Sequence, residues 1–141
     1  GYRASMQVLV MGCGRVGAMI ASSLSKEGHT VYILDPVAEK FRRIPEELLI
    51  KGLVIPIVGD GSDQDHLRKA KIDTADVFIA VSGKDTPNAF SAQIAKHIFQ
   101  VPKVICSLTD VGAQEMYSQL GLIAISPSNF ISSMLLEAIH R

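Results

Sequence analysis

Hydrophobic residues in this chain gather in short runs rich in valine, isoleucine and leucine, and between these runs they recur every three or four positions. The short runs end at glycine, proline, serine or aspartate, which is typical of buried parallel strands. The pattern predicts six strands, at residues 7–11, 30–34, 53–58, 77–81, 103–108 and 122–125. Pro56 interrupts the third strand, which indicates an edge position or an irregular strand.

The stretches between the strands predict helices at residues 16–26, 37–51, 62–71, 86–99, 110–120 and 127–140. Pro45 lies inside the second helix, so a kink or two short pieces are expected there. Ser62 or Asp63 is the expected cap of the third helix. Thr86 is the expected N-cap of the fourth, with Pro87 at its first helical position.

Strands that alternate with helices through short loops predict an α/β protein with a parallel sheet covered on both faces. We expect a Rossmann-type, doubly wound sheet of about six strands in the order 3-2-1-4-5-6, with a ligand crevice between strands one and four. Residues 6–141 are interpreted as one nucleotide-binding domain. Residues 1–5 lack an apolar core and are expected to be an expression scar or a disordered lead-in rather than a signal peptide.

Composition narrows the possible partners. Fourteen basic residues balance fourteen acidic ones among 141 residues. A neutral chain argues against nucleic acid as the main partner and against electrostatic attachment to a membrane. No apolar run is long enough to insert into a bilayer. The two cysteines, in separate apolar runs, suggest reduced thiols and a cytoplasmic location. The four histidines show no metal-ligand spacing, and His29, in a turn, is expected to face solvent.

A glycine-rich turn carries the main chemical signal. Gly12, Gly14 and Gly17 form the pattern G-x-G-x-x-G between a predicted strand and a predicted helix, and Asp35 ends the next strand. In this context the glycines permit a tight turn, a close approach of backbone to a pyrophosphate, and close packing of the helix on the strand. The helix N-terminus attracts phosphate. Asp35 is expected to accept hydrogen bonds from ribose hydroxyls and to repel a 2′-phosphate, so NADP is disfavoured.

Other candidates for contact with the nucleotide lie within this turn and where the later strands end. Arg15 is interpreted as a phosphate ligand or as a solvated surface residue. Cys13 is interpreted as a small filler side chain rather than a reactive thiolate. Asp60 is expected to reach the adenine or to cap the next helix. The full set of predicted cofactor-binding residues is Gly12, Cys13, Gly14, Arg15, Val16, Gly17, Asp35, Asp60, Gly61, Ser82, Gly83 and Asn88.

These segments together resemble the N-terminal domain of regulators of K⁺ conductance, also called the TrkA-N or KTN domain. The likeness rests on the arginine inside the glycine motif and on four further segments, at residues 28–35, 58–61, 72–81 and 120–127. Asn88 enters the site by this resemblance, because it matches an asparagine near the start of the family's fourth helix. The sequence departs from the family at Ile105-Cys106-Ser107, where relatives often carry an arginine.

The resemblance implies a cytoplasmic regulatory domain that binds NAD(H), AMP, ADP or ATP, forms a homodimer or a larger ring, and controls a K⁺ channel or transporter in the membrane. No general base is evident near the nicotinamide position, so a non-enzymatic sensor is the leading hypothesis. The alternatives are the cofactor domain of an NAD-dependent oxidoreductase, and an interaction module with a vestigial cleft. The dimer is expected to use apolar residues of the fourth and fifth helices, Phe90, Ile94, Ile98 and Met116.

Overall fold

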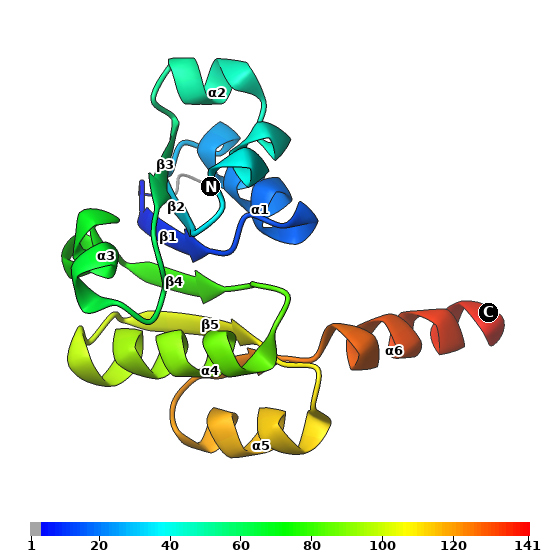
Figure 1. Cartoon of the computed structure of the whole chain (residues 1–141). Helices are drawn as coiled ribbons and strands as arrows, with labels where there is room; N and C mark the ends of the chain where they lie inside the picture. Colours follow the sequence, from blue (N-terminus) through cyan, green and yellow to red (C-terminus); the bar gives the residue numbers. More distant parts are fainter. Residues whose placement is uncertain (1–3) are drawn as a thin grey trace.

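Six parallel strands form one sheet in the order β3-β2-β1-β4-β5-β6 in the computed structural model, which describes residues 4–141 (Figure 1). The strands are β1 (Gln7–Met11), β2 (Thr30–Asp35), β3 (Val54–Val58), β4 (Val77–Ala80), β5 (Lys103–Ser107) and β6 (Ile123–Ile125). The predicted Rossmann-type sheet and its strand order are confirmed. β3 lies at an edge, where the missing N–H of Pro56 is tolerated. Of the predicted lead-in, residues 1–3 lie outside the described residues, and the hydroxyl of Ser5 donates to the Gly28 carbonyl.

Alternate side chains of the central strands enter two separate apolar cores. Val8 and Val10 of β1 face one core, and Leu9 and Met11 face the other. The helical segments α1 (Arg15–Lys26), η1 (Ala38–Arg43) and α2 (Glu46–Ile50) cover the first face. The second face is covered by α3 (Gln64–Lys69), α4 (Asp85–Gln93) with its continuation η3 (Ile94–Ile98), and α5 (Val111–Gln119).

One predicted helix boundary is confirmed and another was wrong. Pro45 divides the predicted helix over 37–51 into two short pieces, η1 and α2. The fourth helix begins at Asp85, two residues before the expected first position at Pro87, and its N-cap is Lys84 rather than Thr86. The Asp85 carboxylate accepts hydrogen bonds from the backbone N–H groups of Thr109 and Asp110, in the loop that follows β5. Pro87 still lies in the first turn, where no N–H is needed.

The last helix, α6 (Pro127–Ile139), extends away from the sheet, as Figure 1 shows. None of its residues is buried. Only Ser126 separates it from β6, and the Ser126 hydroxyl caps the helix by accepting from the Asn129 N–H at 3.4 Å. The predicted helix is therefore present, but it covers neither face of the sheet. Across residues 4–141, the structure contains no helix with both the length and the apolar character that a bilayer crossing requires.

Candidate nucleotide-binding site

The glycine turn, residues Gly12–Gly17, connects β1 to α1 at the edge where the parallel strands end. Gly12 has φ of 110°, and a Cβ on it would lie 2.7 Å from the Ser82 nitrogen. A Cβ on Gly17 would collide with the Gly12 carbonyl oxygen. A Cβ on Gly14 would meet no heavy atom within 4 Å. Packing within the chain therefore explains two of the three glycines, whereas Gly14 leaves its backbone open to an approaching group.

The start of α1 is arranged to attract an anion. Gly14 is the N-cap and supplies no side chain, and no acidic residue stands in the first turn. The first N–H groups of the helix consequently lack a side-chain acceptor and carry the positive end of the helix dipole. Arg15 and Val16 are exposed on this first turn, while Gly17 is buried against the strand. Arg15 lines a shallow hollow of about 540 Å³ between α1 and η1, together with Arg43.

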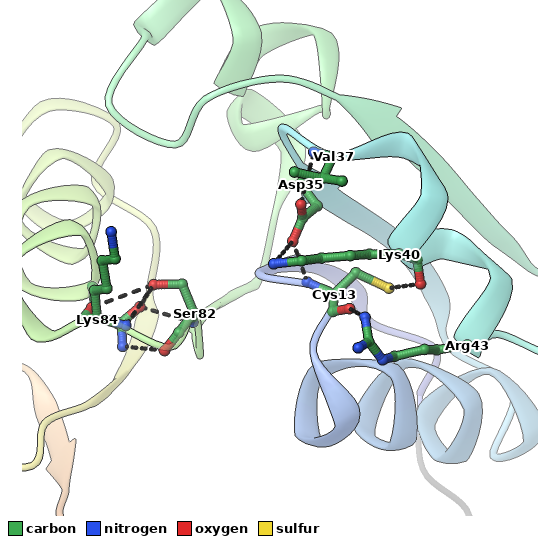
Figure 2. Close-up of polar contacts among 8 residues, drawn as sticks. Cys13, Asp35, Val37, Lys40, Arg43, Ser82 and Lys84 are labelled. Atoms are coloured by element: carbon green, nitrogen blue, oxygen red, sulfur yellow. Dashed lines mark hydrogen bonds and ion pairs between the residues drawn. The ribbon is translucent and has the colours of Figure 1, made fainter.

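Asp35 is buried at the end of β2 and holds the glycine turn (Figure 2). Its Oδ2 accepts a hydrogen bond from the Cys13 N–H, and its Oδ1 accepts one from the Val37 N–H, both at 2.8 Å. The ammonium of Lys40 lies 4.0 Å from Oδ2. Each carboxylate oxygen can accept more than one hydrogen bond, so these contacts leave capacity for ribose hydroxyls.

Two basic residues of η1 that were not predicted from the sequence reach the glycine turn. Arg43 donates from Nη1 to the Cys13 carbonyl at 3.3 Å, and Lys40 pairs with Asp35 (Figure 2). Their spacing of three places both on one side of a helical segment, which is the signal that was available. The Cys13 thiol donates to the Lys40 carbonyl at 3.4 Å. Burial, with a smaller contribution from the Asp35 charge, raises the pKa of Cys13 to about 11, so the thiol stays protonated at neutral pH.

The Asp60 turn, residues Gly59–Gly61, follows β3 and contacts the same edge. Oδ1 of Asp60 accepts from the N–H and the hydroxyl of Ser62, both at 2.8 Å, and these hydrogen bonds lower the pKa of its carboxyl group. Asp63, not Ser62, caps α3 by accepting from two helix N–H groups. A Cβ on Gly61 would lie 2.7 Å from Cγ of Met11, the residue before the glycine turn. The Asp60 turn is thus packed beside the glycine turn.

The end of β4 supplies Ser82 and Gly83, which are positioned by Asn88. The buried Asn88 amide accepts from the Ser82 N–H at 2.9 Å and from its hydroxyl at 2.6 Å. It donates to the carbonyls of Ser82 and Ser107, each at 3.0 Å. All four hydrogen-bonding positions of the amide are therefore used within the chain. Asn88 orients Ser82 and connects β4 to β5, and its own side chain has no remaining group to offer a ligand.

Asp85, at the start of α4, is also held by hydrogen bonds within the chain. Asp85 accepts from the Thr109 N–H at 2.8 Å, the Thr109 hydroxyl at 2.7 Å and the Asp110 N–H at 3.2 Å. The Thr109 backbone and hydroxyl hydrogen bonds lower the pKa of the Asp85 carboxyl group. The Asp85 carboxyl group is therefore ionised at neutral pH, and it accepts hydrogen bonds from backbone N–H groups rather than donating a proton.

Comparison with known sequences gives one consistent family. The TrkA-N domain model matches residues 8–127. The Trk system potassium uptake protein TrkA of Streptomyces coelicolor is 34% identical over 132 residues, covering 94% of this chain and 57% of that protein. The TrkA homolog of Pyrococcus abyssi is 36% identical over 115 residues, covering 82% of this chain and 49% of that protein. The chain spans about half the length of the curated relatives it matches.

Solved structures share the fold at lower sequence identity. The TrkA-N domain of the Escherichia coli inner membrane protein YbaL has a TM-score of 0.81 at 15% identity, covering 97% of this chain and 98% of that one. The Shewanella denitrificans Kef C-terminal domain in AMP-bound form has a TM-score of 0.72 at 24% identity, covering 95% and 80%. The GsuK channel bound to NAD has a TM-score of 0.67 at 14% identity, covering 90% and 22%.

Both kinds of comparison agree on the fold of the chain. The matched residues 8–127 include the whole sheet apart from Gln7, together with the glycine turn, Asp35, the Asp60 turn and Asn88. By this match and by its similarity to the TrkA proteins, the chain belongs to the TrkA-N domain family.

Proposed function

We propose that this domain binds NAD(H) or an adenine mononucleotide (AMP, ADP or ATP) at the edge formed by the glycine turn, and that occupancy regulates a K⁺ channel or transporter without catalysis. One observation carries the proposal: the buried Asp35 carboxylate holds the Cys13 N–H of an uncapped, glycine-rich helix start. This arrangement places an acceptor for ribose hydroxyls beside a cluster of donors for phosphate.

In the proposed complex the phosphates lie on the first turn of α1, over Gly14, with Arg15 and Val16 at its rim. The adenosine ribose lies at Asp35, and the adenine is directed toward Asp60 and Gly61. For a dinucleotide, the second ribose lies near Ser82 and Gly83. Asn88 acts through Ser82, since its amide is saturated. Lys40 offsets part of the Asp35 charge, and the negative charge that remains disfavours the 2′-phosphate of NADP.

The names of the curated relatives support a role in the regulation of K⁺ uptake. The Streptomyces and Pyrococcus relatives are Trk system potassium uptake proteins, and two of the structural neighbours are described in complex with AMP or NAD. In this proposal the domain works at the cytoplasmic face of the membrane, against a transporter or channel subunit. The nucleotide shifts the balance between two conformations of the assembly by binding one of them more tightly.

A homodimer, alone or within a larger ring, is the proposed assembly. The exposed residues of α6 include six large apolar side chains: Phe130, Ile131, Met134, Leu135, Leu136 and Ile139. Ile123 and Ile125 of β6 are also exposed. The single residue Ser126 between β6 and α6 is too short a connection for the helix to turn back onto its own sheet. A second copy of the chain is the simplest cover for both surfaces, with Phe90, Ile98 and Met116 extending the contact.

The proposal is tested by thermal melting with NAD⁺, NADH, NADPH, AMP, ADP and ATP in parallel, on the wild type and on Gly14→Ala. A ligand at a hundred times its dissociation constant stabilises the fold by about 2.7 kcal/mol, which raises the melting temperature of a domain of this size by about 5–10 °C. Gly14→Ala should fold normally, because an added Cβ meets nothing within 4 Å, but it should block the close approach of phosphate.

Gly112→Ala, in the first turn of α5, is the matched control, since it adds the same methyl group to a helix start outside the site. We expect a shift with NADH or a mononucleotide in the wild type and in this control, and none in Gly14→Ala. No shift with any nucleotide would contradict the proposal. An equal shift in Gly14→Ala would show that binding occurs elsewhere. Sustained NADH oxidation by the chain would favour an oxidoreductase instead.

A further inference from the structure

We infer that His66 positions the Asp60 turn of the nucleotide site only while its imidazole is neutral, so that nucleotide affinity decreases as the pH falls. The inference rests on the proposed function, because it takes the Asp60 turn as one wall of the site. His66 belongs to α3 and lies outside the residues that the sequence analysis assigned to nucleotide binding.

The imidazole of His66 contacts the Asp60 turn directly. Its Nδ1 accepts a hydrogen bond from the Asp60 N–H at 2.9 Å. A Cβ on Gly59 would lie 3.0 Å from both Cβ and Nδ1 of His66, so the ring packs closely on the turn. The His66 side chain is 35% exposed, which leaves it accessible to solvent protons.

The turn that His66 supports is also attached to the strands that carry the site. The Gly59 N–H donates to the Asp35 carbonyl at 3.1 Å. Gly61 is packed against Met11, and the next residue, Gly12, donates its N–H to the Leu34 carbonyl at 2.8 Å. A displacement of the Asp60 turn therefore acts on the backbone of Asp35 and on the start of the glycine turn.

The hydrogen bond at Nδ1 requires the neutral ring. A neutral imidazole has one nitrogen that accepts and one that donates, and here the accepting nitrogen is Nδ1. Protonation puts a hydrogen on Nδ1, where it would face the hydrogen of the Asp60 N–H. The proton thus removes the acceptor and leaves two donors opposed to each other.

Charged groups around His66 favour the exchange of its hydrogen bond from the Asp60 N–H for contacts with carboxylates once the ring is protonated. On its own helix, Asp63 has Oδ2 3.5 Å from Nε2, and the Asp60 carboxylate also interacts electrostatically with the ring. On the side of β2, the neighbour that shares the Gly59 contact is the uncharged Leu34. Two carboxylates therefore attract the imidazolium while the Asp60 N–H repels it. The exchange is therefore tested across pH 5 to 8, the range in which histidine side chains in general change their charge.

The first measurement is the dissociation constant of ADP and of NADH by calorimetry, at about pH 8 and about pH 5.5, on the wild type and three variants. In His66→Asn, Oδ1 takes nearly the place of Nδ1 and accepts without titrating. His66→Leu has no acceptor. His97→Asn is the control, because His97 is exposed on η3. The loss of one hydrogen bond typically changes an equilibrium by about two- to tenfold.

We expect wild type and His97→Asn to bind about two- to tenfold more weakly at the lower pH, and His66→Asn to keep its affinity across the range. His66→Leu should bind weakly at both values. The inference is overturned if His66→Asn shows the same pH dependence as the wild type, or if His66→Leu binds as tightly as the wild type at the higher pH.

The second measurement needs no nucleotide, and so it separates this inference from the proposed function. The amide resonance of Asp60, followed by NMR through the same pH range, should titrate in the wild type and stay constant in His66→Asn. If the resonance titrates but no nucleotide binds at any pH, the proposed function fails and the positioning role of His66 stands. If the resonance does not move in the wild type, the inference is wrong even where nucleotide binds.

Discussion

The two ends of the sheet differ in how completely their apolar surfaces are covered. Around β1 and β2, helices on both faces bury side chains such as Val10 and Leu34 completely, and the loops at the strand ends are tied together by Asp35. Around β6, Ile123 and Ile125 remain exposed, and the following helix contributes no buried residue. At the first end the core around β1 and β2 is covered within one chain, although Val58 of the edge strand β3 is 58% exposed. The second end leaves apolar side chains of β6 and α6 uncovered within one chain, and the proposed dimer would cover them.

The largest effect is expected from a methyl group placed inside the first end. Gly17→Ala directs a Cβ at the Gly12 carbonyl oxygen, a backbone atom that cannot move without shifting the strand. We expect the free energy of unfolding to fall by about 3 kcal/mol or more, as for severe overpacking. Urea denaturation followed by circular dichroism measures this.

Gly14→Ala is the comparison for that measurement, because the two glycines stand in the same turn and differ in the space around them. It should change the unfolding free energy by less than about 1 kcal/mol. Equal losses in the two variants would mean that the close packing of α1 on the glycine turn does not stabilise this end.

A second prediction concerns the open end. Leu135→Asp with Ile139→Asp places two charges on one side of α6, four residues apart. If this helix forms the dimer, its dissociation constant should rise at least about tenfold, because a buried unpaired charge is costly. The monomer should lose little stability, since both residues are already exposed. Sedimentation velocity over a range of concentrations measures the association.

Ser133→Asp adds a charge on the opposite side of the same helix and serves as the control. It should leave association nearly unchanged. A wild type that stays monomeric at high concentration, or a double variant that associates as well as the wild type, would mean that another surface completes the sheet.

The smallest effect is expected where the two ends meet, at Asp85. Hydrogen bonds from the Thr109 backbone and hydroxyl lower the pKa of this carboxyl group in the folded state. The stabilisation is therefore present above the pKa of the unfolded chain, near pH 4, and is lost as the pH falls through the lower folded-state value. Asp85→Asn should flatten this acid dependence in urea denaturation between about pH 7 and about pH 3. An unchanged acid profile would mean that the Asp85 carboxylate does not stabilise the contact between α4 and the loop that follows β5.

The parts of the fold that could be predicted from the sequence are those set by local periodicity. Alternating apolar runs and helical stretches identified the six strands and their order, and Pro45 correctly divided a helix. The start of α4 was predicted two residues late, and the contacts of Asp85, the observed first residue, come from a loop that is distant in sequence. His29 was expected to face solvent and is buried instead, with Nδ1 accepting from the Met6 N–H at 3.0 Å.

The candidate site shows the same division between local and distant information. The glycine turn and Asp35 lie where the motif placed them, because turn geometry and strand ends are local properties. The roles of Lys40 and Arg43 depend on how η1 packs beside the turn, because their spacing of three puts both on one side of η1 but does not say which surface that side meets. His66 was missed although its partner Asp60 is only six residues away, because the contact depends on how the turn between β3 and α3 directs the ring back onto the Asp60 N–H.

The one-residue connection between β6 and α6 also has a mechanical meaning. Ser126 is buried, its hydroxyl fixes the first turn of α6, and Pro127 leaves the joint little freedom. A helix of 13 residues is about 20 Å long, so a rotation of about 10° at its base displaces its far end by about 3 Å. Small reorientations of the sheet edge are thus magnified at the tip of α6, which acts as a stiff lever rather than as a flexible tether.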